Sequence, residues 1–168
     1  MSQPIDVPTD PACAEATGRL PVAHDDRHLV AVFDSPVAAE LAHFARHLGY
    51  AVTVLDAVSD VDSAGITTRT DVVVTDHDRP ELGDVLAAVL RTDARWIGVM
   101  GSPRHAPPHV PALRGLGVDE ADIARVHRPI GLDIGSRAPA EIAVATLAGL
   151  LADRNGRSGG FYSARPSN

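Results

Sequence analysis

The stretch HLVAVFDSPVAAELAHFARHLGYAVTVLD, residues 28–56, decides the fold that we expect for this chain. It opens with His28–Phe33, a largely apolar run that is typical of a buried strand. Apolar residues then recur at the spacing of one helix face: Val37, Leu41, Phe44 and Leu48. Gly49 stands where that helix would stop, and a second apolar strand follows over residues 51–55. A strand, a helix and a strand in this order predict a right-handed βαβ unit with parallel strands.

The same alternation continues along the rest of the chain. We expect further strands over residues 71–75 and 95–100, and helices over 81–90, 108–113, 119–124 and 139–151. This pattern predicts an α/β protein with a three-layer, Rossmann-like parallel sheet and helices on both faces. Residues 28–152 would form the folded domain. A flexible N-terminal arm (1–27) and a flexible C-terminal tail (153–168) would flank it, since both are rich in proline, glycine and polar residues.

Composition restricts the class of protein. The 168 residues carry a formal net charge of −7, and 45% of them are hydrophobic. This balance is typical of one globular domain and argues against nucleic-acid binding, which needs a basic face. The single cysteine, Cys13, excludes an internal disulfide and a cysteine-based zinc cluster. Because we find no signal peptide and no apolar stretch that could span a membrane, we expect a cytoplasmic protein without a membrane partner.

Two glycine-punctuated segments follow strands of the predicted sheet. They are GVMGSPR, residues 98–104, and HRPIGLDIG, residues 127–135. Glycine lets the backbone turn sharply and approach a ligand closely, and Arg104, His127 and Arg128 add positive charge. In open α/β sheets, ligands bind at the carboxyl ends of the strands, where both segments should lie. The sequence therefore predicts an edge of the sheet that holds an anionic ligand.

The ordered motifs resemble the Rossmann-type C-terminal domain of the XdhC/CoxI family over roughly residues 29–151. The matching motifs are WIGVMGSPR at 96–104, LRGLGV at 113–118, IARVHRPIGLDIG at 123–135 and PAEIA at 139–143. The resemblance implies a factor that assists the maturation of molybdenum hydroxylases such as xanthine dehydrogenase. Such a factor would bind the molybdenum cofactor (molybdopterin), protect it, and support its sulfuration and insertion.

The resemblance also implies partners. Members of the family usually carry a further N-terminal domain with a cysteine motif, whereas only a short arm precedes the first strand here and Cys13 lies in no such motif. We therefore expect the partner to be a molybdenum hydroxylase client, or a chain that carries the missing domain. A homodimer is a further alternative.

The first strand–helix turn departs from the family pattern of Gly-x-Gly-x-x-Gly/Ala. The corresponding positions here are Phe33, Ser35 and Ala38. The first two glycines of such a loop allow the tight turn and the approach of backbone to a pyrophosphate, and Pro36 removes one more backbone N–H. Ser35 is still suited to cap the following helix, and Asp56 keeps the position that is expected to meet a ribose hydroxyl. We therefore expect weakened binding of dinucleotides.

The candidate ligand-binding residues follow the strands of the predicted sheet. They are Ser35, Asp56, Thr75, His77, Gly101, Ser102, Arg104, His127, Gly131 and Asp133. The turn at 101–104 would cradle a phosphate or a pterin phosphate, and Thr75 and His77 resemble the family's Thr-His-Asp after the third strand. A structural alternative stays open for each segment: a tight turn at 101–104, a polar turn at 75–78, and a loop at 127–135. We expect no metal site.

Three functions remain open at this point. The first is an XdhC-like accessory protein that binds the molybdenum cofactor. The second is an NAD(P)- or FAD-linked oxidoreductase that uses the same cleft, and the third is an interaction domain whose ligand site has decayed. The chain contains no lysine, hence no Walker lysine, and no nucleophile elbow. We therefore expect an accessory factor rather than an enzyme acting alone.

Overall fold

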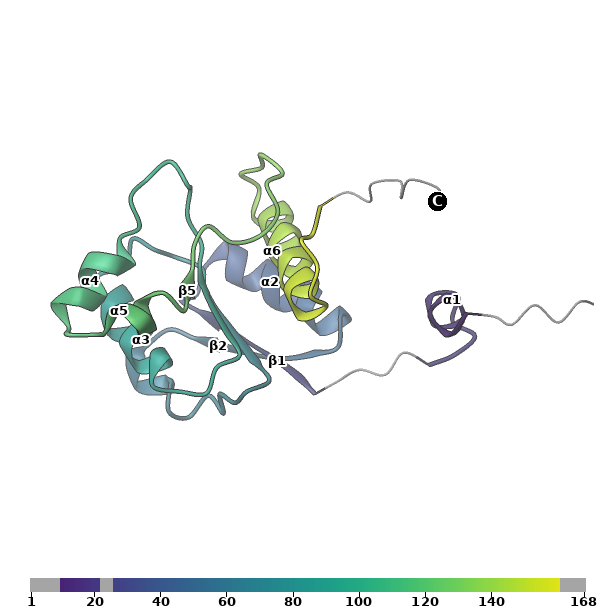
Figure 1. Ribbon diagram of the computed structural model, residues 1–168, viewed down its shortest axis with the longest axis horizontal. Helices are drawn as coiled ribbons and strands as arrows, with labels where there is room; N and C mark the ends of the chain where they lie inside the picture. The colour runs from purple at the N-terminus through teal and green to yellow at the C-terminus, as the bar shows by residue number, and fades with distance from the viewer. Residues whose placement is uncertain (1–9, 22–25, 161–168) are drawn as a thin grey trace, which may run out of the picture.

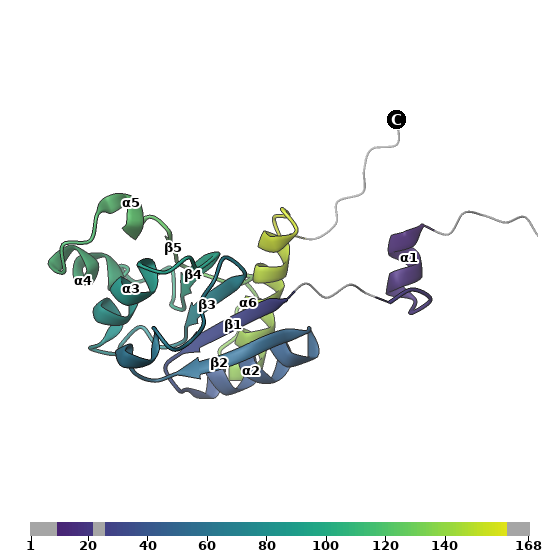
Figure 2. The ribbon, with the colours of Figure 1, turned by 90° about the horizontal axis from the view of Figure 1, so that it is seen from below.

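The computed structural model describes residues 10–21 and 26–160, and its centre is one parallel sheet. The 5-stranded sheet has the order β2-β1-β3-β4-β5 (Figure 1, Figure 2). Its strands are β1 (Arg27–Val32), β2 (Tyr50–Leu55), β3 (Thr70–Val74), β4 (Trp96–Val99) and β5 (Val126–His127). Because β2 is added on one side of β1 and all later strands on the other, the topological switch point lies between β1 and β3. Ligands of open α/β sheets bind at such a point, outside the carboxyl ends of the strands.

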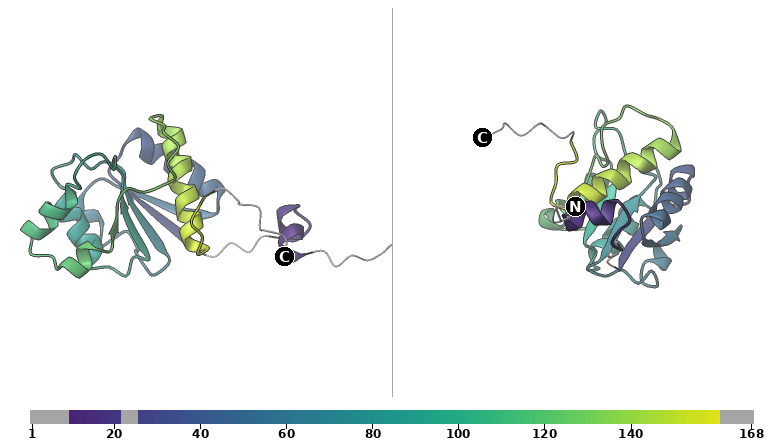
Figure 3. Two further views of the ribbon diagram at one scale, coloured as in Figure 1. Left: turned by 45° about the horizontal axis from the view of Figure 1, so that its top comes forward. Right: turned by 90° about the vertical axis from the view of Figure 1, so that its right-hand side faces the viewer.

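Helices cover both faces of the sheet (Figure 3). On one face, α2 (Pro36–His47) packs beside α6 (Pro139–Arg154). The other face is covered by α3 (Leu82–Leu90), α4 (His109–Gly115), α5 (Glu120–Ile123) and the 3-10 turn η1 (Val58–Asp60). This arrangement confirms the expected three-layer, Rossmann-like α/β fold. Among the described residues, no helix is both long enough and apolar enough to cross a membrane.

Two apolar cores lie on the two faces because alternate residues of a strand point to opposite sides. In β1, Val30 and Val32 belong to the core beneath α3, whereas Leu29 and Ala31 belong to the core beneath α2 and α6. All four side chains are buried. A strand buried on both faces has no polar alternation, which explains why the sequence shows continuous apolar runs.

Helix α2 begins and ends where the sequence predicts. Ser35 Oγ accepts a hydrogen bond from the Ala38 N–H at 3.0 Å, which confirms Ser35 as the N-cap. Leu48 ends the helix, and Gly49 follows in the left-handed conformation with φ of +82°. The turn delivers the chain directly into β2.

Three local features differ from the expectation. β5 (Val126–His127) is an additional short strand, and it places the second glycine segment at the sheet edge. α1 (Pro11–Ala16) is a helix inside the segment that was expected to be an arm. α6 continues to Arg154, past the expected boundary at residue 152, and its last two residues, Asp153 and Arg154, form ion pairs with Arg95 and Asp71.

These ion pairs form a cluster around the buried Asp71 at the amino-terminal edge of the sheet. Asp71 is fully buried, and its carboxylate oxygens accept from Arg95 Nε at 2.6 Å and from Arg154 Nε at 2.8 Å. Arg95 also pairs with Asp153 at 2.6 Å. The cluster fastens the end of α6 to the starts of β3 and β4.

Candidate functional site

The carboxyl ends of four strands lie level at one edge of the sheet. Val32 pairs with Val74, Val74 pairs with Val99, and Gly98 pairs with His127. The segments that leave β1, β3, β4 and β5 therefore start side by side. This edge is the place where the sequence predicts a ligand.

Phe33, directly after β1, has a left-handed backbone with φ of +71°. Its N–H donates to the Leu55 carbonyl oxygen at 2.7 Å, and its side chain is fully buried. This conformation suits glycine and costs roughly 1–2 kcal/mol for a residue that has a Cβ. The turn keeps the backbone shape of a glycine turn, but a buried phenyl ring occupies the space that glycine would leave open.

Ser35 and Thr75 bond to each other across the switch point. Ser35 Oγ donates to Thr75 Oγ1 at 2.9 Å. Thr75 Oγ1 lies 3.0 Å from the Val32 carbonyl oxygen and 2.9 Å from the Phe33 carbonyl oxygen, and its one proton donates to either of them. Both hydroxyls therefore tie β1, β3 and α2 together, and a ligand would compete with these bonds.

Asp56, at the end of β2, is bound to the neighbouring turn. Its Oδ1 accepts from the Asp34 N–H at 3.2 Å and lies 3.5 Å from Arg79 Nη1. Arg79 also donates from Nε to Glu81 at 3.3 Å and lies over the Phe33 ring, 4.8 Å from its centroid. Arg79 thus pairs with two carboxylates, Asp56 and Glu81, in this half of the edge.

His77 lies in a polar turn that precedes α3. The Asp78 N–H donates to Asp76 Oδ1 at 2.9 Å, and His77 Nε2 lies 3.6 Å from Asp78 Oδ1. These bonds favour the turn interpretation of this segment. Together with Asp34 and Asp56, the turn makes the β1–β3 half of the edge acidic, so this half suits N–H or O–H donors of a ligand better than a phosphate.

The half over β4 and β5 holds more arginine and fewer carboxylates. Residues 100–118 contain no carboxylate, Arg104 and Arg128 lie on this half, and Asp133 is the carboxylate in the segment 127–135, which begins at the end of β5. Arg104 is exposed, and its backbone N–H donates to Ser102 Oγ at 3.2 Å. Because these two arginines, without a carboxylate partner among the described residues, lie at this end of the edge, an anionic group of a ligand would be attracted to it rather than to the end with Asp34 and Asp56.

Arg128, directly after β5, lies against Gly101. A methyl group added to Gly101 would lie 2.6 Å from Arg128 Nε and 2.9 Å from Arg128 Cζ, so a larger residue would displace the guanidinium. Arg128 Nη1 also donates to the His105 carbonyl oxygen at 3.1 Å. These contacts bring the two glycine segments together.

The surroundings of Arg128 contain unsatisfied polar atoms. Arg128 Nε, Arg128 Nη2 and His109 Nδ1 are all buried and have no hydrogen-bond partner within the described residues. His109 is 3% exposed, and burial together with the charge of Arg128 lowers its pKa. A buried polar group without a partner costs about 1–3 kcal/mol. These three atoms are therefore the strongest indication of a ligand contact on the edge.

The second glycine segment mainly contacts α6 and β4. Gly131 has φ of +82°, and a methyl group added there would lie 3.1 Å from the Thr146 backbone nitrogen. The ring of His127 stacks on Trp96 with 5.1 Å between centroids, and Asp133 is exposed. The structural alternative for this loop predicts such packing contacts, and ligand binding by Gly131 and His127 stays a prediction.

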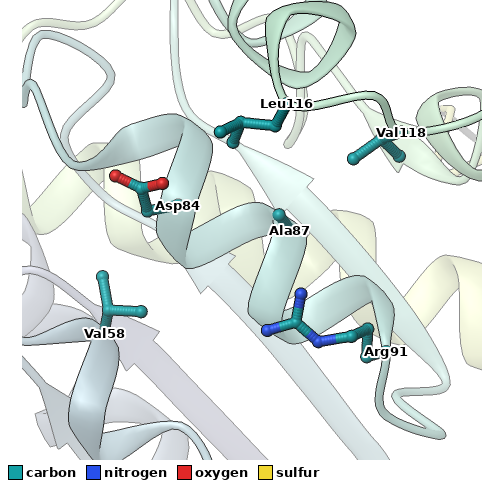
Figure 4. Close-up of a pocket in the computed structure, with 6 residues that line it drawn as sticks. All are labelled: Val58, Asp84, Ala87, Arg91, Leu116 and Val118. Carbon is teal, nitrogen blue, oxygen red and sulfur yellow. The ribbon is translucent and has the colours of Figure 1, made fainter.

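Hollows in the surface lie elsewhere. One of about 470 Å³ runs along α3 and is lined by Val58, Asp84, Ala87, Arg91, Leu116 and Val118 (Figure 4). Another, of about 240 Å³, lies at the amino-terminal edge beside Arg69 and Arg154. No candidate residue lines either hollow. Within the described ranges, no three His, Cys, Asp or Glu side chains are grouped as a metal site would require.

The structure divides the candidate residues into three groups. The first group, Ser35, Asp56, Thr75 and His77, lies around the switch point. The second, Gly101, Ser102 and Arg104, follows β4, and the third consists of His127, which ends β5, and of Gly131 and Asp133, which follow it. The sequence analysis noted the positive charge of Arg128 but did not predict it as a binding residue. His109 gave no signal, because nothing in a proline-rich segment indicates which histidine is buried.

Two comparisons with known proteins cover most of the chain. The uncharacterized protein YqeB of Escherichia coli K12 is 33% identical over 133 residues, which is 79% of this chain and 22% of YqeB. A Bacillus halodurans crystal structure described as a xanthine dehydrogenase matches with a TM-score of 0.64 at 20% identity, over 78% of this chain and 45% of that one. The second likeness shows the fold. The chain spans about one fifth of the curated relative's length.

The family model described as the XdhC Rossmann domain matches residues 29–150, from the first residues of β1 to the last turns of α6. This range contains every strand of the sheet from Leu29 onward and all the candidate site residues. The chain belongs to the XdhC Rossmann domain family.

Proposed function

We propose that this chain is an XdhC-like accessory domain that binds the molybdenum cofactor and helps to deliver it to a molybdenum hydroxylase. Family membership over residues 29–150 supports the accessory role. The observation that carries the choice of ligand is the charge division of the carboxyl edge. A phosphorylated pterin has a dianionic phosphate at one end and ring N–H donors at the other.

The phosphate end of such a ligand suits the β4–β5 half of the edge. Residues 100–118 lack carboxylates, and Ser102, Arg104 and Arg128 provide hydroxyl and guanidinium donors there. Guanidinium groups bind phosphate through charge-assisted, often bidentate hydrogen bonds. The pterin ring would extend toward Asp34 and Asp56, whose oxygens accept hydrogen bonds.

A dinucleotide suits the edge less well. Its pyrophosphate would lie at the first turn, where Phe33 is buried in a left-handed conformation and Pro36 provides no N–H. The carboxylate of Asp34, in the same turn, would also repel the pyrophosphate, although Asp56 keeps the position suited to a ribose hydroxyl. We therefore place the NAD(P)- or FAD-linked oxidoreductase second.

In this proposal the chain's residues bind and orient rather than react. The cofactor, when bound, would supply the metal chemistry of the client enzyme. Arg104 and Arg128 would hold the phosphate, and the loop that begins at Gly101 would shield that end from water. The client hydroxylase, or a chain with a complementary domain, would then receive the ligand.

Equilibrium titration of the whole chain with molybdopterin under anaerobic conditions tests the proposal. We expect saturable binding that Arg104→Ala weakens several-fold and that Arg46→Ala, a matched exposed arginine on α2, leaves unchanged. Parallel titrations with NAD, NADP and FAD should give weaker binding or none. An absence of saturable molybdopterin binding to the unmodified chain would contradict the proposal.

A further inference from the structure

One edge of the Arg128 guanidinium, formed by Nε and Nη2, has no hydrogen-bond partner within the described residues. A guanidinium can present Nε and Nη2 together, as two parallel donors that match two oxygens of one phosphate or carboxylate. In Arg128, Nη1 is the nitrogen that bonds the protein, at the His105 carbonyl oxygen. Nε and Nη2 are both buried and unpartnered. The bidentate edge is thus oriented by the fold and left without an acceptor.

His109 adds a third unpartnered atom beside this edge. Its side chain is almost fully buried, its Nδ1 has no partner, and it is close enough to Arg128 for that charge to lower its pKa. A neutral imidazole carries one N–H and can donate it from Nδ1. Arg128 therefore offers two unpartnered donors and His109 a third, and no carboxylate lies in the segment 100–118 to accept them.

We infer that Arg128 and His109 form an oxyanion subsite, which receives the phosphate group of the ligand. The inference rests on the proposed function for the identity of the whole ligand, but not for the anion itself. Two oxygens of the anion accept from Arg128 Nε and Nη2, and one of them or a third oxygen accepts from His109 Nδ1.

The loop from Gly101 to His105 covers this subsite. Gly101 lies directly against Arg128 Nε and Nη2, and residues 103–107 are exposed. One hydrogen bond, from Arg128 Nη1 to the His105 carbonyl oxygen, joins the loop to Arg128. An oxyanion reaches the bidentate edge when the backbone at Gly101 moves aside, so binding changes the environment of the loop as well as that of Arg128.

Nitrogen-15 NMR of the whole chain during titration with inorganic phosphate tests the inference. We expect a saturable shift of the Arg128 Nε–H signal and of the backbone signals of residues 101–105. A titration with acetate separates a phosphate subsite from a carboxylate subsite, and we expect acetate to bind more weakly because it carries less charge. A phosphate response confined to Arg104 and Ser102, with no shift at Arg128, would overturn the inference.

Variants separate charge from geometry. Arg128→Lys keeps the positive charge but cannot form the bidentate pair, so phosphate affinity should fall by about tenfold, and Arg128→Gln, which also removes the charge, should lower it further. The phosphate affinity of His109→Gln should fall less than that of the Arg128 variants, since the glutamine amide can replace one donor. Arg46→Gln is the control for net charge. Equal affinity in the unmodified chain and in a folded Arg128→Lys or Arg128→Gln variant would refute the subsite.

The outcome is distinguishable from that of the proposed function. Molybdopterin binding without any phosphate response at Arg128 would refute this subsite and leave the proposed function standing. Phosphate binding at Arg128 in a chain that does not bind molybdopterin would support the subsite and refute the proposed ligand.

Discussion

The left-handed conformation of Phe33 leads to an unusual order of stability between two substitutions. Phe33→Ala removes a fully buried ring, which costs about 3–5 kcal/mol, and leaves a Cβ in the left-handed conformation. Phe33→Gly loses the same ring. Relief of the backbone strain stabilises this variant by roughly 1–2 kcal/mol, and the greater entropy of its unfolded chain destabilises it by about 0.4–1 kcal/mol. We therefore expect Phe33→Gly to be more stable than Phe33→Ala by about 0.5–1 kcal/mol.

Urea unfolding followed by circular dichroism measures this difference. The same pair of substitutions at Phe44, within α2, is the control, because glycine in a helix is less stable than alanine by about 1 kcal/mol. The sign of the Gly-minus-Ala difference should thus reverse between the two positions. If alanine were the more stable residue at both, the left-handed turn after β1 would be refuted.

Three further predictions concern the loop, the ion cluster and two histidines, the half-buried His28 and the buried His109. In thermal unfolding, Gly131→Ala should destabilise more than Gly135→Ala, because both have positive φ but only Gly131 lies against the α6 backbone, and equal losses would contradict its packing role. In urea unfolding, Asp71→Asn should cost about 3–5 kcal/mol, because two partly buried arginines lose their carboxylate, whereas Asp122→Asn should change stability by at most about 1 kcal/mol. Burial lowers the pKa of His28 and His109 below the ordinary 6.5. As the pH drops below about 6.5, these histidines therefore bind protons in the unfolded chain before they do so in the folded chain, and the free energy of unfolding should fall. His28→Gln with His109→Gln should flatten that pH dependence in urea unfolding, and an unchanged slope would contradict it.

Local signals explain the parts of the fold that the sequence predicted. The apolar runs of β1 and β3 are buried on both faces, and Ser35 and Gly49 mark the two ends of α2 by their side-chain and backbone chemistry. Each of these features depends on residues that are close in the sequence. β5 was not predicted, because two residues that pair with β4 are too few to form an apolar pattern.

The candidate site was harder to predict because its contacts are long-range. The approach of Arg128 to Gly101 joins segments from different strands, and no spacing in the sequence encodes it. The sequence also treated Phe33 as the loss of a glycine, whereas the structure keeps the left-handed turn with the ring buried. Gly131 was predicted from its residue type to contact a ligand, and its close approach to α6 has no local signal in the sequence.

Native mass spectrometry of the whole chain, purified from cells that make the molybdenum cofactor, tests the central claim most directly. We expect an adduct with the mass of a phosphorylated pterin on the unmodified chain, and its loss in Arg128→Gln. An adduct with the mass of NAD, NADP or FAD, or no adduct at all, would contradict the claim that the carboxyl edge of the sheet holds a phosphorylated pterin.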